Sequence, residues 1–341
     1  MNRFSGRAFL IAAVALAWLW LGSQKARAAE PLIDGKPEKS QLEVAIAASG
    51  PLYLPLLVAH EAGYFSNHGL TLTISVVSGS TAAQGILSGK IDIYQGGAVI
   101  ITANLAGGDL IYVAAAVDRS TLVLFGQNGL KSVESLRGKS VATTSPGAFG
   151  EIAMRKSARE HGLEVGKDIK LLYHRSTQEA LATFLAANAE GLIITPPQSD
   201  MARNKGYPVI LDYYKEGLRI VGPGVGLTRT FIKAYPKTVR AYLKGYLDGV
   251  KRCFDDPAYA AKINAKYNKI SDPKALDESY QQGAKVWNKD LTVSPDAIRL
   301  VLAESGNPKA GEIDATRFYD NSIIRELNRE YAAKLFPGEI R

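Results

Sequence analysis

The stretch that decides the fold is "VATTSPGAFGEIAMRKSAREHG", residues 141–162. A short run with strand propensity, Val141 to Thr144, meets a Ser-Pro-Gly turn, and a helical stretch then closes on Gly162. Pro146 suits the first turn of a helix, where its missing N–H costs nothing. Gly162 stands where a helix end favours a left-handed residue. A junction of this kind points backbone N–H groups at a bound anion or carbonyl.

The same order of parts occurs earlier in the chain, from Val44. There "VAIAASGPLYLPLLVAHEAG" precedes "LTLTISVVSGSTAAQGILSGKIDIYQGGA", and after residue 162 comes "DIKLLYHRSTQEALATFLAANAEGLIITPP". Ser49 and Ser145 are 96 positions apart, and so are Ser80 and Ser176. The last two each begin a Ser-Thr pair that suits a helix N-cap. Two units of alternating strand and helix predict two parallel α/β sheets.

The distinctive turns all fall at the carboxyl ends of the predicted strands, where α/β sheets bind ligands. We expect hydroxyls and backbone amides there to donate to a solute, and Phe149 and Tyr53 to stack on it. Each residue could instead be only a turn or cap residue. The expected solute contacts are Ser49, Gly50, Pro51, Leu52, Tyr53, Ser80, Thr81, Gly97, Ala98, Ser145, Gly147, Ala148, Phe149 and Pro196.

Three further side chains are candidates for the charged part of the site. Arg119 precedes the first predicted crossing between the units, and His174 and Arg175 end a strand of the second unit. Either arginine could pair a carboxylate or sulfonate, but exposed arginines are common on protein surfaces. Sulfonates, carboxylates and neutral heteroaromatic solutes therefore all stay open.

Two connections between the units predict two lobes on two hinges. "TLVLFG" reads as a strand that leaves the first lobe, and "LRIVGPGVGLTRTFI" as one that returns, with Gly222-Pro223-Gly224 as a break. We expect lobe 1 to comprise residues 29–125 and 226–341, and lobe 2 residues 126–225. The tail after Pro236 reads as helices that cover lobe 1. One apolar face there includes the single cysteine, Cys253.

The first residues indicate export. Arg3 and Arg7 precede an apolar run over residues 8–22, and Ala26-Arg27-Ala28 fits a cleavage site. Residues 1–28 are therefore expected to be a signal peptide. The alternative, a retained membrane anchor, would need about 20 apolar residues. Loss of the segment lowers the net charge from +8 to +4, too little to indicate nucleic-acid binding. We expect a periplasmic protein.

Catalytic and metal-binding patterns are lacking in the sequence. The single cysteine excludes a disulfide framework and a cysteine metal cluster. Gly138-Lys139-Ser140 lacks the earlier glycine of a phosphate-binding loop, and His60-Glu61 lacks the second histidine of a zinc protease. No G-x-S-x-G motif occurs. We expect no catalytic residue, no metal and no cofactor.

Four stretches resemble the nitrate/sulfonate/taurine (NitT/TauT) solute-binding proteins of ABC importers, over roughly residues 42–260. They are "VAIAASGPLYLPLLVAHEAGYFSNHGLTLTI", "SGSTAAQGILSGKIDI", "GLKSVESLRGKSVATTSPGAFGEI" and "TRTFIKAYPKTVRAYLKGYLDGVKRCFDDP". The resemblance implies a type II periplasmic-binding-protein fold, a small solute between two lobes, and delivery to permease subunits. We also expect a monomer. The second unit departs from the family pattern, because "AANAEGLIITPP" leaves Asp92 without a counterpart.

Two other functions compete with solute capture for an importer. One is an enzyme on the same fold, since a distant branch of the family makes a thiamine pyrimidine precursor with a cysteine-rich motif that this chain lacks. The other is an accessory protein that presents its solute to a sensor. It differs from the importer component only in its partner.

Overall fold

The computed structural model describes residues 35–307 and 310–340, so the predicted signal peptide at 1–28 lies outside the described residues. Ten strands form two sheets of five, in the orders β2-β1-β3-β10-β4 and β7-β6-β8-β5-β9. The strands are β1 (Gln41–Ile46), β2 (Thr71–Val76), β3 (Ile93–Gly96), β4 (Leu110–Arg119), β5 (Val123–Gly126), β6 (Lys139–Thr143), β7 (Ile169–Tyr173), β8 (Gly191–Ile194), β9 (Val209–Asp212) and β10 (Arg219–Thr228).

The repeat in the sequence is a repeat in the structure. In each sheet three strands are parallel, β1 with β2 and β3, and β6 with β7 and β8. Wholly parallel sheets were expected. The sheets are mixed instead, because the strands that cross between them, β10 and β5, pair antiparallel with their neighbours.

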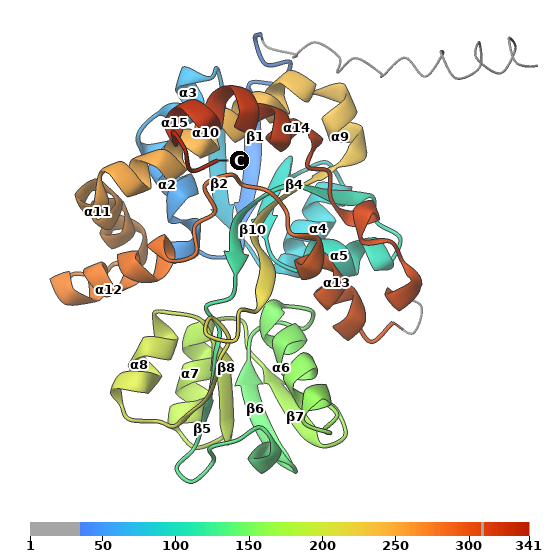
Figure 1. Cartoon of the computed structure of the whole chain (residues 1–341), viewed down its shortest axis with the longest axis vertical. Helices are drawn as coiled ribbons and strands as arrows, with labels where there is room; N and C mark the ends of the chain where they lie inside the picture. Colours follow the sequence, from blue (N-terminus) through green and yellow to red (C-terminus); the bar gives the residue numbers. More distant parts are fainter. Residues whose placement is uncertain (1–34, 308–309, 341) are drawn as a thin grey trace, which may run out of the picture. The chain divides into compact units, whose positions relative to one another are not determined.

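Helices follow the strands in the predicted order (Figure 1). Those of the two repeated units are α2 (Leu54–Glu61), α3 (Tyr64–Asn67), α4 (Gly79–Leu87), α5 (Val99–Leu105), α6 (Phe149–Glu160), α7 (Thr177–Leu185) and α8 (Gln198–Asn204). The tail is helical as predicted, with α9 (Arg229–Ala234), α10 (Pro236–Asp255), α11 (Pro257–Asn268), α12 (Pro273–Ala284), α13 (Pro295–Glu304), α14 (Ser322–Leu327) and α15 (Ala333–Leu335).

The two crossings lie next to each other. The last strand before the first crossing, β4, pairs with the returning strand, β10, and the chain changes sheet at residues 120–122 and 213–218 (Figure 1). The expected boundaries at 125/126 and 225/226 therefore fall inside β5 and β10. Gly222-Pro223-Gly224 lies within β10, where the register with β4 shifts between Arg219 and Gly222. Lys36–Arg341 form one compact unit, so the division into two lobes stays a prediction.

The helix ends follow the local predictions with two corrections. Gly63 and Gly162 are left-handed, with φ of 75° and 67°, and Ser176 caps α7 by accepting from the Glu179 amide. Ser78, not Ser80, caps α4, because Ser78 is the extended residue whose hydroxyl accepts from the amide of the third residue after it. Pro146 precedes α6 rather than starting it, since the helix is capped at residue 148.

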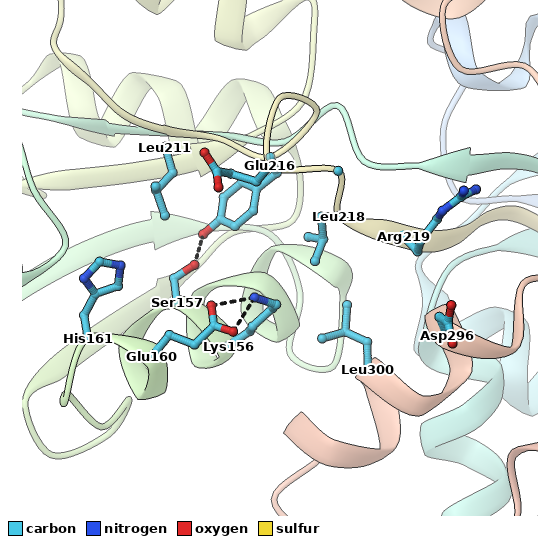
Figure 2. Close-up of a pocket in the computed structure, with 12 residues that line it drawn as sticks. Lys156, Ser157, Glu160, His161, Leu211, Glu216, Leu218, Arg219, Asp296 and Leu300 are labelled. Atoms are coloured by element: carbon cyan, nitrogen blue, oxygen red, sulfur yellow. Dashed lines mark hydrogen bonds and ion pairs between the residues drawn. The ribbon is translucent and has the colours of Figure 1, made fainter.

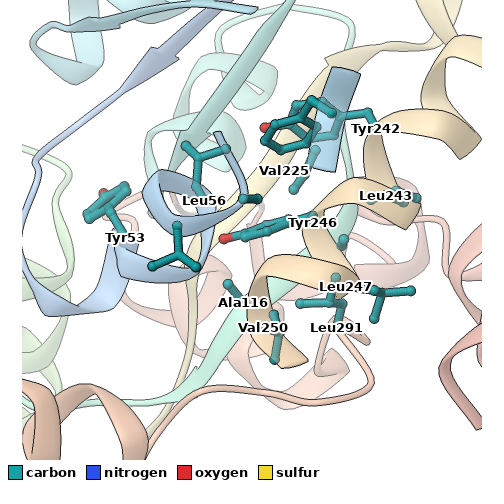
Figure 3. Packing of buried hydrophobic residues seen from close by; sticks show 14 of the residues in the cluster. Tyr53, Leu56, Ala116, Val225, Tyr242, Leu243, Tyr246, Leu247, Val250 and Leu291 are labelled. Atoms are coloured by element: carbon teal, nitrogen blue, oxygen red, sulfur yellow. The ribbon is translucent and has the colours of Figure 1, made fainter. Parts of the chain in front are cut away.

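The predicted apolar face of α10 forms the centre of the largest core (Figure 3). Tyr242, Tyr246 and Val250 on this face are fully buried, together with Cys253. Burial raises the pKa of the Cys253 thiol, so the thiol stays protonated. The core packs α10 against α2, the helix that follows the first strand-end turn. The tail therefore holds that turn in place.

Asp92 does have a counterpart in the second unit, contrary to the expectation from the sequence. Asp92 accepts from the Glu43 amide at 3.0 Å, beside β1. Glu190 accepts from the Ser140 amide at 2.9 Å and from its hydroxyl at 2.8 Å, beside β6. A glutamate thus does in one sheet what an aspartate does in the other, and the repeat is preserved.

Candidate functional site

The first strand-end turn, after β1, is held by the helical tail. The Ser49 hydroxyl donates to Asn268 Oδ1 at 3.0 Å, and the Asn268 side-chain amide donates to the Ser49 carbonyl at 2.7 Å. Trp287 Nε1 donates to the Pro51 carbonyl at 3.0 Å. Tyr53, expected to stack on solute, is 9% exposed and belongs to the core. This turn is tied to the helical tail, and its serine donor already has an acceptor.

The second turn of the first sheet carries exposed hydroxyls at the start of α4. Ser78 Oγ lies 3.1 Å from Ser80 Oγ and 2.9 Å from Thr81 Oγ1. The three side chains are exposed. Ser80 and Thr81 are therefore open to solvent and stay candidates for solute contact, and the sequence did not single out Ser78, which lies beside them.

The turn after β3 touches the second unit. A Cβ placed on Gly97 would lie 2.7 Å from Phe149 Cδ2 and 2.9 Å from Phe149 Cε2. The Phe149 ring also packs against core clusters of both sheets. Ala98 is buried, and the Tyr112 hydroxyl donates to the Gly97 carbonyl. Two residues predicted separately for the site thus meet each other, and Phe149 covers glycine backbone in this structure.

The turn after β6 has already engaged the amides that were expected to hold a solute. The Gly147 amide donates to Glu151 Oε2 at 2.9 Å, and the Ala148 amide donates to the Ser145 carbonyl at 3.2 Å. Glu151 is 8% exposed, and its other oxygen accepts from Arg155 Nε at 2.8 Å. The turn has the predicted strand–helix geometry, but a carboxylate of the chain itself lies at the helix N-terminus.

The other second-unit candidates lie at the ends of β7 and β8. The His174 amide donates to the Thr143 carbonyl at 3.0 Å, while His174 Nε2 is buried without a partner among the described residues. Pro196 is buried, and Arg175 and Arg119 are exposed. The two arginines are therefore available to solvent, and neither is enclosed in a way that would fix an anion.

Two buried hydroxyls at the same sheet edge were missed by the sequence reading. Thr143 ends β6 and Ser199 lies in the first turn of α8; both are 0% exposed. Neither hydroxyl oxygen has a hydrogen-bond partner within residues 35–307 and 310–340. An unpaired buried hydroxyl is costly. Thr143 was readable only as strand, because nothing local distinguishes a paired from an unpaired threonine.

A cavity of 310 Å³ lies beside the returning crossing, apart from the strand-end turns (Figure 2). It is lined by α6, by residues 211–219 and by α13, and by none of the predicted site residues. Its cations are paired, Lys156 with Glu160 and Arg219 with Asp118. The Ser157 and Tyr213 hydroxyls lie 2.8 Å apart. Because these cations are already paired with carboxylates, the cavity attracts anions only weakly.

Next to this cavity an ion pair ties α6 to α13. Arg159 donates through two nitrogens to Glu304 Oε1, at 2.6 and 3.1 Å. The Glu304 side chain is 5% exposed, whereas that of Arg159 is 62% exposed. The pKa of Arg159 is raised by its hydrogen bond to Glu304. The pair is therefore buried at its carboxylate and solvated at its cation.

This asymmetry predicts unequal costs for the two partners. Arg159→Met leaves a buried carboxylate unpaired and should lower the free energy of unfolding by about 3 kcal/mol. Glu304→Gln leaves an arginine that water can solvate and should cost only about 1 kcal/mol. Urea denaturation of both variants measures the difference. A larger loss for Glu304→Gln would contradict the asymmetry.

Among residues 35–307 and 310–340, no group of three or more His, Cys, Asp or Glu side chains is arranged to hold a metal ion. None of the helices within residues 35–307 and 310–340 has both the length and the apolar character needed to cross a bilayer.

Comparison with known proteins agrees with this architecture. Residues 51–260 match the model of the family described as NMT1/THI5 like. The chain is 20% identical over 314 residues to YtlA of Bacillus subtilis (strain 168), named as a binding protein, which covers 84% of this chain and 89% of YtlA.

Solved structures share the fold. The alkanesulfonate-binding protein SsuA from Xanthomonas axonopodis pv. citri, bound to MOPS, superposes with a TM-score of 0.67 at 19% identity, covering 82% of this chain and 96% of SsuA. The periplasmic nitrate-binding protein NrtA from Synechocystis PCC 6803 gives 0.70 at 13% identity, covering 89% and 90%. The expected periplasmic-binding-protein fold is confirmed.

Proposed function

Because the chain belongs to the NMT1/THI5-like family, we propose that it is the solute-binding component of an ABC importer. In the periplasm it captures a small organic solute between the strand-end turns of its two sheets, and it delivers this solute to a membrane permease. The binding proteins for alkanesulfonate and nitrate that share its fold support this role.

The observation that carries the proposal is the contact of Phe149 with Gly97. It joins the start of α6 to the turn after β3, so the strand-end turns of both sheets meet beside two adjacent crossings. Such an arrangement lets a solute that touches both sides bias an open–closed equilibrium. The predicted turn residues Ser80, Thr81 and Ser145 are proposed as polar contacts, together with Thr143.

Binding is tested by thermal unfolding of the exported protein with nitrate, alkanesulfonates, aromatic carboxylates and uncharged heterocycles. A solute that raises the Tm should also be taken up by cells, and uptake should stop when the gene is deleted. Chromatography of the incubated solute checks for turnover. Steady product formation from a stabilising solute would assign the chain to the enzyme class instead.

The unpaired Thr143 hydroxyl gives a sharper prediction. Thr143→Val keeps the shape and removes an unsatisfied group, so the solute-free protein should be as stable as wild type or more stable. If the solute satisfies this hydroxyl, its affinity should fall about tenfold, the loss of one hydrogen bond. Calorimetric titration measures the affinity.

Thr238→Val is the matched control, because the buried Thr238 hydroxyl is bonded to Glu38 and to the Lys39 carbonyl. It should lower stability and leave affinity unchanged, the reverse of the result expected for Thr143. A Thr143→Val variant that is destabilised but binds normally would remove this hydroxyl from the proposed site.

A further inference from the structure

The helices that begin at the strand-end turns differ in charge between the two sheets. In the second unit, α6 and α7 each carry a glutamate in the first turn, Glu151 and Glu179. Their counterparts in the first unit, α2 and α4, have no acidic residue there. A helix N-terminus carries about half a positive charge. That charge is offset by a carboxylate in one unit and kept in the other.

Glu151 lies where a solute anion would bind to α6. Its Oε2 accepts from the Gly147 amide at 2.9 Å, and its burial keeps it in that position. Arg155 neutralises the other oxygen, at 2.8 Å from Nε and 2.7 Å from the second guanidinium nitrogen. A carboxylate or sulfonate of a solute would have to displace the buried Glu151 carboxylate, which has the same charge and is hydrogen-bonded through both oxygens.

Glu179 repeats the arrangement one strand away. Its Oε2 accepts from the Arg175 amide at 3.1 Å, four residues before it, as Glu151 does from the amide four residues before it. The turns after β6 and β7 are thus occupied by the chain's own carboxylates. In the first unit the Thr81 amide of α4 donates to Ser78 Oγ, as the Glu179 amide does to Ser176 Oγ, but α4 has no acidic residue in its first turn.

The second-unit edge also holds polar groups that still need partners. The Thr143 hydroxyl is fully buried and unpaired among the described residues, and a Cβ on Gly150 in the first turn of α6 would lie 2.4 Å from it. A hydroxyl can accept from an N–H as well as donate. The edge therefore offers carboxylate oxygens and this hydroxyl as acceptors, beside Arg155, which is already paired with Glu151, and the exposed Arg175.

We propose that the two sides of the solute site recognise different chemical groups. The second-unit side accepts N–H donors and excludes acidic groups, and an acidic group of the solute, where it has one, lies against the exposed start of α4. The solute class is therefore an amide- or amino-bearing molecule without an acid at the second-unit end. This inference rests on the proposed function and names the chemistry of the same site.

Matched acid and amide pairs test the polarity, namely nicotinate with nicotinamide, benzoate with benzamide and methanesulfonate with methanesulfonamide. Titration calorimetry gives the affinity of each for wild type and for the double variant Glu151→Gln/Glu179→Gln. Glutamine keeps an oxygen that can accept from the same amide. Glu160→Gln is the control, because it removes a charge from the last turn of α6.

In each pair that binds, we expect wild type to bind the amide more tightly than the acid. The double variant should reduce this ratio of affinities by roughly tenfold or more. The control should leave the preference unchanged. If wild type prefers the acid, or if Glu160→Gln changes the preference as much as the double variant does, the proposed polarity is wrong. The proposed solute-binding function would still stand. If no acid and no amide binds, the proposed function fails, and the polarity fails with it.

Discussion

Gly97→Val is expected to lower solute affinity by about 5-fold to 150-fold, the range that a coupling of 1–3 kcal/mol produces. Even a Cβ at this position would lie 2.7 Å from the Phe149 ring. Overpacking of such a contact costs typically 1–3 kcal/mol. The clash arises only when the turn after β3 meets α6, so an open arrangement avoids it and the solute-free protein keeps its stability.

Two measurements separate this cause from a simple loss of folding. Small-angle scattering should give a larger radius of gyration for Gly97→Val than for wild type, and urea denaturation should give a similar free energy of unfolding. The affinity is measured with the solute that stabilises wild type most in the thermal screen.

A double-mutant cycle with Phe149→Ala identifies the ring as the obstacle. In the Phe149→Ala background the valine at position 97 meets no ring, so it should have little further effect on affinity. If Gly97→Val weakens binding equally in both backgrounds, another contact is responsible. If Gly97→Val binds the solute as tightly as wild type does, closure does not depend on the contact between Gly97 and Phe149.

The order of elements could be predicted from the sequence because it is written in local patterns. Ser49 and Ser145 stand at matching turns, after β1 and β6, and the three parallel strands of each unit pair in the same order. Alternating strand and helix propensity is enough for this. The direction of β5 and β10 was missed, because nothing local tells a crossing strand which neighbour it will join.

The turns that form the candidate site could be predicted from the sequence. Which of their hydrogen-bond donors already have partners could not. Ser49 meets Asn268 219 positions away, and no spacing rule connects them. Glu179 follows Ser176 with the spacing of a capping box, so its turn towards the helix start was readable, although it accepts from the Arg175 amide rather than from that of Ser176. Glu151 follows Ala148, and without a cap serine its reach to the Gly147 amide appears only in the folded chain.

A change at Gly249 should cost the most stability. This glycine lies on α10 where the helix crosses α2. A Cβ there would lie 2.3 Å from the Pro55 carbonyl oxygen and 2.6 Å from Ala59 Cβ. A backbone oxygen cannot rotate away, so any side chain separates the two helices. Gly249→Leu should lower the free energy of unfolding by about 3 kcal/mol or more.

Gly249→Ala is the informative intermediate, because helix propensity favours alanine by about 1 kcal/mol. Close packing predicts a net loss even so, and the leucine variant should lose more. Gly50→Ala is the matched control: its φ is −67° and a Cβ there meets nothing within 4 Å, so stability should be near wild type. Urea denaturation orders the three variants. A Gly249→Ala protein more stable than wild type would mean that α10 can move off α2 at no cost, and the turn after β1 would then lose its support.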